Sequence, residues 1–125
     1  MKLDETNRLN LRFDAAGLVT VVVEDASTHE TLMVAHANAE AIAHTLETGV
    51  AHFWSRSRSE LWRKGATSGN ELVVENVLVD CDQDALLYQV NVQGRGVACH
   101  TGRRSCFYRS IGSDGSELSF VDAGR

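Results

Sequence analysis

Three aspartates occupy every second position of one short segment, and acidic side chains this close together suit a bound cation. On an extended strand, Asp80, Asp82 and Asp84 would place three carboxylates on one face and Cys81 on the other. Like charges repel unless a cation holds them, and hard oxygen ligands select Mg²⁺, Mn²⁺ or Ca²⁺. The Cα atoms of Asp80 and Asp84 would lie about 13 Å apart on a flat strand. Either the segment bends, therefore, or the three carboxylates do not all contact one ion. A solvated acidic turn is the alternative.

The cysteines suggest a second kind of metal chemistry. The chain has three of them, Cys81, Cys99 and Cys106, all within the last 45 residues. An odd count does not suit a disulfide framework and favours a metal site or a reactive thiol. Three protein ligands on Zn²⁺ would leave a fourth position for a water whose pKa falls to about 7. A closed structural site would need a fourth ligand, for which His100 is the nearest candidate. Because no CxxC pair occurs, buried structural cysteines remain an alternative.

Positive charge collects in two short segments that are rich in Ser, Thr and Gly. Seven of the twelve cationic residues lie there: Arg56, Arg58, Arg63, Lys64, Arg103, Arg104 and Arg109. Guanidinium groups, hydroxyls and exposed backbone N–H groups are the partners that phosphate oxygens prefer. The pattern therefore favours a phosphorylated small molecule. A solvated charged face, paired with local acids such as Glu60, is the alternative.

Aromatic residues and histidines add weaker signals. Trp54 and Trp62 could stack on a base, although a lone tryptophan more often occupies a core position. His52 and His100 lie beside the charged segments, and His100 is also close in sequence to the proposed metal ligands. Both a hydrogen-bonding role and a general-base role are open for His100. The other histidines are expected to be structural or at the surface: His29, His36 and His44.

Four β-rich runs must position these groups. Residues 17–25 and 31–35 are rich in β-branched side chains and predict a hairpin. Residues 72–79 and 85–92 predict two more strands, one on each side of the acidic cluster. We therefore expect the aspartates to lie where one strand ends and the next begins.

One helix is expected, at residues 39–48. Asn38 can cap its first N–H groups, Glu40 suits its positive end, and Gly49 follows as a stop signal. Several strands with one main helix predict a small α+β fold with a mostly antiparallel sheet.

The remaining segments read as connections. Residues 51–54 are expected to be extended, and residues 55–70 to form a long loop with little to pack in a core. A last short strand is predicted at 107–109, followed by a tail rich in Gly, Ser and Asp.

Composition indicates one globular domain. The chain has 125 residues, of which 43% are hydrophobic and 23% charged. We expect one domain over residues 1–125, with 1–16 as an N-terminal extension and 111–125 as a tail. The net charge of -5 argues against a protein that coats nucleic acid. There is no apolar run of about 18 residues for a membrane span, and the first thirty residues lack the apolar stretch of a signal peptide. We therefore expect a cytoplasmic protein without membrane or nucleic-acid partners.

Four segments, in this order, resemble the phosphoribosyl-AMP cyclohydrolase family. They are HFWSRSR at 52–58, LWRKGATSGN at 61–70, DCDQDAL at 80–86 and CHTGRRSCFYR at 99–109. The resemblance runs from about Gly17 to Arg109. There are two departures. Residues 34–38 differ from the Tyr-Met-Asn or Trp-Met-Asn usual before the helix, and Asn70 stands where relatives often have His. We therefore assign Asn70 no role in proton transfer.

The resemblance implies an activity and an assembly. The reaction is hydrolytic opening of the adenine ring of phosphoribosyl-AMP between N1 and C6, the third step of L-histidine biosynthesis. Its product is phosphoribosyl-formimino-aminoimidazole carboxamide ribotide. The assembly is an intertwined homodimer with active sites at the interface. Carried over position by position, the resemblance implies Zn²⁺ ligands drawn from two subunits, Cys81, Cys99 and Cys106, and Mg²⁺ ligands Asp80, Asp82 and Asp84.

The chemistry of the residues agrees with this reaction. Alkylation at N1 makes C6 electrophilic, and a zinc-activated water is a suitable nucleophile. His100 is our candidate for catalytic proton transfer. The residues expected to bind the nucleotide substrate are Trp54, Arg56, Arg58, Arg63, Lys64, Thr67, Ser68 and Arg103.

Two other functions compete with this one. A zinc nucleoside deaminase would also attack a ring carbon, but its H-x-E…P-C-x-x-C signature cannot occur in a chain without proline. A zinc-stabilised binding module for nucleotides or RNA, which would use the arginine segments as its contact surface, belongs to a different class. Metal removal separates them, because a structural zinc site unfolds on chelation whereas a catalytic one loses turnover.

Overall fold

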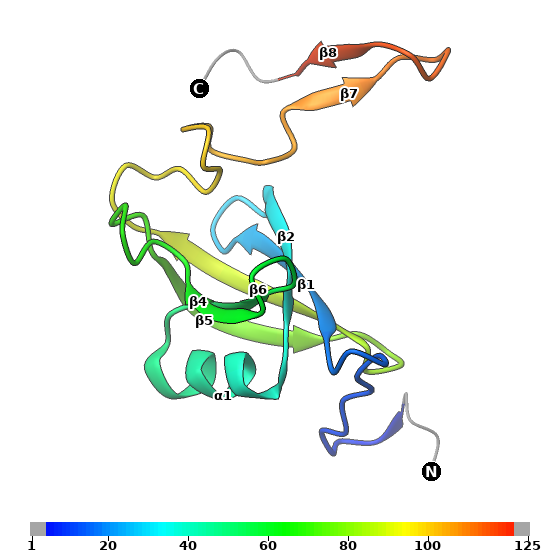
Figure 1. Ribbon diagram of the computed structural model, residues 1–125, viewed down its shortest axis with the longest axis vertical. Helices are drawn as coiled ribbons and strands as arrows, with labels where there is room; N and C mark the ends of the chain where they lie inside the picture. The colour runs from blue at the N-terminus through cyan, green and yellow to red at the C-terminus, as the bar shows by residue number, and fades with distance from the viewer. Residues whose placement is uncertain (1–4, 122–125) are drawn as a thin grey trace.

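The computed structural model describes residues 5–121, which form eight strands and one helix (Figure 1). In chain order these are β1 (Val19–Asp25), β2 (Thr31–Ala37), α1 (Ala39–Thr48), β3 (His52–Ser55), β4 (Glu60–Arg63), β5 (Leu72–Val79), β6 (Ala85–Val92), β7 (Arg109–Ile111) and β8 (Leu118–Phe120). The small α+β fold with one helix is therefore confirmed.

The main sheet has four strands in the order β2-β1-β6-β5. The predicted β1–β2 hairpin is antiparallel, as is the β5–β6 pair that flanks the acidic cluster. β1 and β6 are the two central strands and run parallel, with Val22 opposite Leu87. The sheet is thus mostly antiparallel, as expected, and its one parallel pair joins the two hairpins.

Helix α1 begins and ends where its capping residues predict. The Asn38 side chain accepts a hydrogen bond of 2.8 Å from the Ala41 N–H. Gly49 adopts the left-handed conformation (φ 76°) and donates its N–H to the Thr45 carbonyl. In the described part of the chain no helix is both long and apolar enough to cross a membrane.

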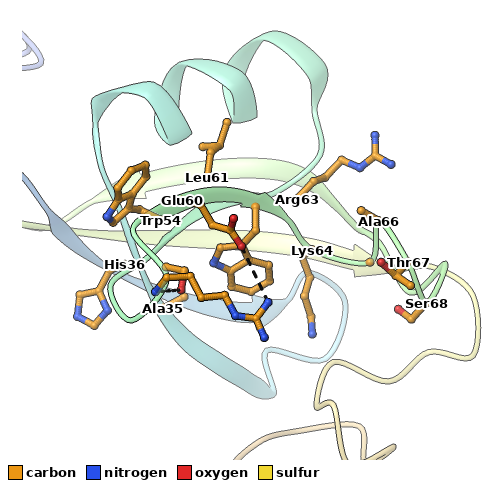
Figure 2. A pocket seen from close by; sticks show the side chains of 14 residues that line it. Ala35, His36, Trp54, Glu60, Leu61, Arg63, Lys64, Ala66, Thr67 and Ser68 are labelled. Carbon is orange, nitrogen blue, oxygen red and sulfur yellow. Dashed lines mark hydrogen bonds and ion pairs between the residues drawn. The ribbon is translucent and has the colours of Figure 1, made fainter.

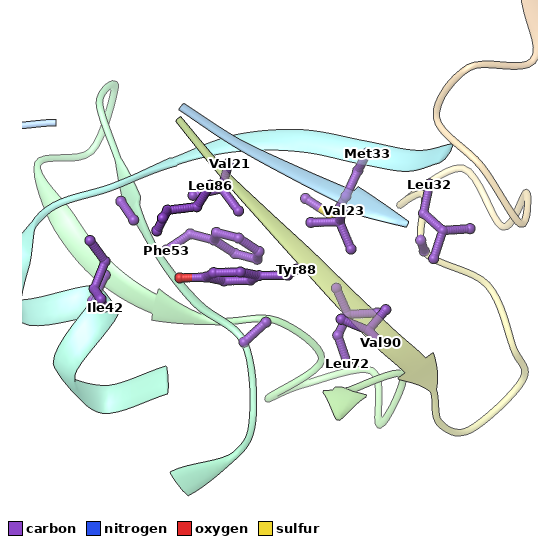
Figure 3. Packing of buried hydrophobic residues seen from close by; sticks show 14 of the residues in the cluster. Val21, Val23, Leu32, Met33, Ile42, Phe53, Leu72, Leu86, Tyr88 and Val90 are labelled. Atoms are coloured by element: carbon purple, nitrogen blue, oxygen red, sulfur yellow. The ribbon is translucent and has the colours of Figure 1, made fainter. Parts of the chain in front are cut away.

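The core lies on one face of the main sheet. Alternate residues of β1, Val19, Val21 and Val23, are buried, as period-two alternation requires. The rings of Phe53 and Tyr88 stack with centroids 6.0 Å apart at the centre of this core (Figure 3). The core therefore packs β3 directly against β6.

The prediction of a long loop over residues 55–70 is wrong at Ser55, which ends β3, and at residues 60–63, which form β4. Strand β4 pairs antiparallel with β3 to form a second sheet, with Phe53 opposite Trp62 and their rings 5.0 Å apart. The reason is that Leu61 and Trp62 supply apolar surface that packs against the core. Trp62 therefore packs against the core, and because it is only partly buried it also lines the cavity described below.

The C-terminal prediction is also corrected. The strand predicted at 107–109 is β7, which begins at Arg109, and it is not the last strand because the predicted tail continues into β8, which pairs with β7. A tight turn closes this hairpin through the hydrogen bond from the Gly112 N–H to the Glu117 carbonyl. The hairpin projects from the rest of the molecule (Figure 1). Residues 1–4 of the expected extension and 122–125 of the expected tail lie outside the described residues.

Candidate active site

A cavity of about 700 Å³ opens beside the β3–β4 hairpin (Figure 2). Its walls come from β2, from β3 and β4, and from the loop that follows β4. Six of the eight residues predicted to bind substrate line it: Trp54, Arg58, Arg63, Lys64, Thr67 and Ser68. The fold thus brings most of the first basic segment to one concave surface.

The cavity carries an excess of positive charge. Arg58 and Glu60 approach to 3.9 Å, but both side chains are largely exposed, so this ion pair is weak. Arg63 forms a closer pair with Glu71, at 3.0 Å. Within residues 5–121, Lys64 forms no ion pair, so its ammonium group is available to an anionic ligand.

A tight loop after β4 presents the hydroxyl groups of Thr67 and Ser68. Gly65 has φ 83°, and a Cβ atom at this position would collide with the Asn70 backbone. The Gly69 N–H closes the turn on the Gly65 carbonyl at 2.8 Å. The Asn70 side chain accepts a hydrogen bond from the Arg95 N–H at 2.8 Å, so Asn70 joins two loops.

His36 is a wall residue that the sequence interpretation missed. It was expected to be structural or at the surface, but it lines the cavity from β2. Figure 2 shows His36 and Trp54 at one end of the cavity and Thr67 and Ser68 at the other. Burial, and to a smaller extent Arg56, lower the pKa of His36, while Asp14 acts in the opposite direction. A neutral imidazole at this end can both donate and accept a hydrogen bond.

The three aspartates lie in a turn and not along a strand. The Gln83 N–H bonds to the Asp80 carbonyl at 3.1 Å, and Gln83 adopts φ 58°. This bend brings carboxylate oxygens of Asp80, Asp82 and Asp84 within 4.8 Å of one another. The three carboxylates therefore do not share one face of a flat strand. The segment bends instead, which is the first of the two alternatives in the sequence analysis.

The N-terminal segment supports this turn. The buried Gln83 side chain accepts from the Asn10 N–H at 2.6 Å and donates to the Arg8 carbonyl at 3.1 Å. Hydrogen bonds with Asp82 and Asp80 raise the pKa of Asp84, as expected for converging carboxylates that compete for a proton. Three exposed carboxylates around one point fit a divalent cation with oxygen ligands.

Two of the three cysteines are neighbours in the loop after β6. The Cys99 N–H bonds to the Arg103 carbonyl at 3.0 Å, and the Cys106 N–H bonds to the Leu32 carbonyl on β2 at 2.7 Å. These contacts fold the loop back on itself, so that the two thiols lie close enough for each to influence the pKa of the other. The Thr101 hydroxyl donates to the Cys99 sulfur at 3.0 Å.

The surroundings of the loop shift the pKa values of the two thiols in opposite directions. Burial alone would raise the pKa of Cys99, but hydrogen bonds from Thr101 and Cys106 lower it overall. Partial desolvation and the adjacent Cys99 raise the pKa of Cys106 to about 11. Lys64 has a smaller effect, which lowers the pKa and so favours the thiolate at both sites. A pair of converging thiols fits a Zn²⁺ ion.

Cys81 is not part of this pair within one chain. It is exposed in the turn before β6, whereas Cys99 follows β6. β6 has eight residues, so these two ends are roughly 23 Å apart at about 3.3 Å per residue. Figure 1 shows the 80–84 turn beside the N-terminal segment and the 98–106 loop at the other end of the sheet. Ligands of one zinc ion lie about 2.3 Å from it. One chain therefore supplies two of the three expected thiols to a common point.

The other predicted site residues lie at the margins. His100 is exposed next to Cys99, and Arg56 is exposed in the β3–β4 turn outside the cavity wall. Arg103 does not line the cavity either. Its guanidinium group lies 4.3 Å from the centre of the Tyr108 ring and 5.0 Å from that of Phe120, which ties the C-terminal hairpin to the cysteine loop.

Comparison with known proteins places this site in a family. A family model described as Phosphoribosyl-AMP cyclohydrolase matches residues 33–108. A protein of Sphingopyxis alaskensis is 64% identical over 118 residues, which cover 94% of this chain and 91% of the relative. A protein of Chelativorans sp. (strain BNC1) is 62% identical over 109 residues, which cover 87% of this chain and 78% of the relative. A protein of Brucella abortus (strain 2308) is 58% identical over 112 residues, which cover 90% of this chain and 94% of the relative.

All three relatives are named phosphoribosyl-AMP cyclohydrolase. The matched residues contain the β3–β4 hairpin, the acidic turn and the cysteine loop. The chain therefore belongs to the phosphoribosyl-AMP cyclohydrolase family of hydrolases.

Proposed function

We propose that this chain hydrolyses the N1–C6 bond of the adenine ring of phosphoribosyl-AMP, in the third step of histidine biosynthesis. Family membership supports the reaction. The observation that carries the proposal to this chain is the cavity, in which Lys64, two arginines and two hydroxyl groups face one space, and Lys64 has no ion-pair partner among residues 5–121. A nucleotide that carries two phosphate groups matches that surface in charge and in hydrogen-bonding capacity.

The ends of the cavity suggest how the substrate is oriented. Lys64, Thr67 and Ser68 would hold phosphate oxygens, with Arg58 and Arg63 adding charge. Trp54 and the neutral His36 at the other end would contact the base.

Two metals are part of the proposal. Cys99 and Cys106, completed by Cys81 of a second copy, would hold Zn²⁺, because the two thiols of one chain already converge. When bound, Zn²⁺ supplies a Lewis acid that activates water near neutral pH. Thr101 would stabilise the Cys99 thiolate through its hydroxyl. The exposed His100 would move a proton between solvent and the reacting centre.

Asp80, Asp82 and Asp84 would hold Mg²⁺. Since Cys81 lies inside this acidic turn, the cation would also neutralise the carboxylates next to a zinc thiolate. We accordingly propose a homodimer in which the turn of one subunit meets the cysteine loop of the other, and one domain that spans the chain.

A turnover assay with controlled metal content tests the proposal. Ring opening of phosphoribosyl-AMP, followed by absorbance, should be lost after chelation and return on addition of Zn²⁺, while far-ultraviolet circular dichroism stays unchanged. A chelated protein that unfolds would favour the zinc-stabilised binding module. Full turnover by metal-free protein would refute the metal part of the proposal, and no turnover with any metal would refute the reaction.

A further inference from the structure

A partly buried ion cluster connects the cysteine loop to the turn between β1 and β2. The Arg104 guanidinium donates from Nε to Glu30 Oε1 at 2.6 Å, from Nη2 to Asp25 Oδ2, and from Nη1 to the Gly96 carbonyl at 3.3 Å. The side chain of Arg104 is 26% exposed and that of Asp25 only 8%. Arg104 therefore uses every nitrogen of its fork on partners within the chain.

The Asp25 carboxylate is itself held in place. Its Oδ1 atom accepts from the Ser27 N–H at 2.8 Å, the Ser27 hydroxyl at 2.7 Å and the Thr28 N–H at 3.1 Å. This arrangement leaves Oδ2 facing Arg104. A carboxylate that is fixed and nearly buried requires a charged partner, so the position of Asp25 dictates that of the Arg104 side chain.

The backbone of Arg104 transmits this anchor to both cysteines. Its carbonyl accepts from the Ala98 N–H at 3.0 Å, which aligns the chain entering Cys99 with the chain leaving Arg103. On the other side, the buried Ser105 hydroxyl donates to the Thr31 carbonyl at 2.7 Å, directly before Cys106. Arg104 and Ser105, which lie between the two cysteines in sequence, thus fix the backbone on the approach to each thiol.

We infer that Arg104, fixed by Asp25 and Glu30, is a positioning residue that holds Cys99 and Cys106 in metal-binding geometry before a metal arrives. The inference rests on the proposed zinc site. The loop has no regular secondary structure of its own, so without this anchor metal binding would have to order it at a cost in affinity. The cluster does not line the substrate cavity, and we therefore assign it to metal binding and not to substrate recognition.

Cobalt binding tests the inference on the purified full-length protein. Co²⁺ bound by thiolates absorbs in the near ultraviolet, so a titration reports both affinity and ligand geometry without any need for turnover. Arg104→Lys keeps the charge but loses the planar fork, and Asp25→Asn keeps an oxygen for the Ser27 and Thr28 N–H groups. Each variant should bind Co²⁺ about 10- to 100-fold more weakly than wild type, as expected for an outer residue that orients ligands.

The double variant should lose no more affinity than the weaker-binding single variant, because the two side chains act as one unit. Arg95→Gln is the matched control, since it removes an exposed guanidinium from the same loop and should leave the titration unchanged. Glu30→Gln keeps a neutral acceptor for Arg104 and should give a smaller loss. Glu30→Gln also keeps the inference testable if Arg104→Lys or Asp25→Asn, which remove more of the cluster, does not fold.

The inference would be overturned if folded variant protein bound Co²⁺ with the affinity and spectrum of wild type. This holds for Arg104→Lys, Asp25→Asn or Glu30→Gln. Such a result would leave the proposed zinc site intact. A wild-type protein without a thiolate–cobalt band would instead refute the proposed zinc site, and the inference with it.

Discussion

At the scale of single residues, the candidate site depends on a few charged groups with fixed neighbours. Lys64 lines the cavity without an ion-pair partner in the described chain, whereas Arg63 is paired with Glu71. Asp25 is buried and fully hydrogen-bonded although it touches neither the cavity nor a cysteine. Substitutions at Lys64 should therefore weaken ligand binding. Substitutions at Asp25 should lower the stability of the fold and loosen the loop that carries Cys99 and Cys106.

Lys64→Gln should raise KM for phosphoribosyl-AMP by roughly 10- to 100-fold, because a charge-assisted hydrogen bond contributes about 1.5–3 kcal/mol. Steady-state kinetics measures this, and kcat should change less than KM. Because Lys64 also favours the thiolate forms of Cys99 and Cys106, zinc content is measured in parallel. Arg95→Gln serves as the control. An unchanged KM at full zinc content would remove Lys64 from the substrate site.

Asp25 should make stability depend on pH in the acidic range. Burial would raise its pKa, but hydrogen bonds from Ser27 and Thr28 and the charge of Arg104 lower it from 3.8 to about 2. A carboxyl whose pKa is lower in the folded state stabilises the fold above the unfolded value, and this contribution is lost as pH falls towards the folded value. Its size is about 2 kcal/mol.

Asp25→Asn should therefore be less stable than wild type by about 2 kcal/mol near pH 6. The difference should shrink between pH 4 and pH 2. Urea unfolding at a series of pH values measures it, with Glu30→Gln for comparison. A difference that stays constant over this range would show that the ionised form of Asp25 is not what stabilises the protein.

At the scale of elements, the hairpin of β3 and β4 and the loop after it shape the cavity. Hydroxyls alternate with cations over residues 55–59, so the sequence pattern is that of a polar loop, although the adjacent Leu61 and Trp62 pack against the core. Period-two alternation over four residues is a weak signal. Pairing with β3 is what makes β4 a strand, and this pairing explains why the sequence suggested candidate binding residues but not the element that carries them.

Gly65→Ala should distort the loop that presents Thr67 and Ser68, because a Cβ atom at Gly65 collides with the Asn70 backbone. Gly69 is a matched control, since its φ of 80° is similar but no atom lies within 4 Å of a Cβ built there. Gly69→Ala should cost only the left-handed conformation, about 1–2 kcal/mol. Gly65→Ala should lose more stability in thermal unfolding and also raise KM. Equal effects of the two substitutions would argue against the close contact at Gly65.

At the scale of the whole molecule, the three expected zinc ligands belong to opposite ends of β6. Cys81 precedes the strand, while Cys99 and Cys106 follow it. One folded chain cannot bring them to a common ion without unfolding the main sheet. The proposed homodimer resolves this separation, because each zinc site then takes Cys81 from one subunit and the thiol pair from the other.

Mixing two inactive variants tests this arrangement. Cys81→Ser and Cys99→Ser should each lack turnover, but a mixed dimer contains one site with all three wild-type cysteines. Partial activity should therefore appear after subunit exchange, reaching up to about a quarter of the wild-type value for random pairing of equal amounts. Mixing Cys99→Ser with Cys106→Ser is the control and should restore nothing, because both residues come from the same chain. No recovery in the first mixture, with exchange demonstrated, would place each site within one subunit.

The sequence by itself determined the local structure and the chemistry of the site. The strands 72–79 and 85–92, the helix with its Asn38 and Gly49 caps, and the residue types for metal and phosphate binding all follow from short-range patterns. The bend of the acidic turn, the β3–β4 pairing and the place of His36 in the cavity wall were decided only by the tertiary structure. The bend and the place of His36 depend on contacts between segments distant in sequence, such as Gln83 with Asn10 or β2 with β3. Strand β4 depends on the packing of Leu61 and Trp62 against the core. Local periodicity carries no information about such pairings, and they are what bring the thiol pair of Cys99 and Cys106 to the edge of β2.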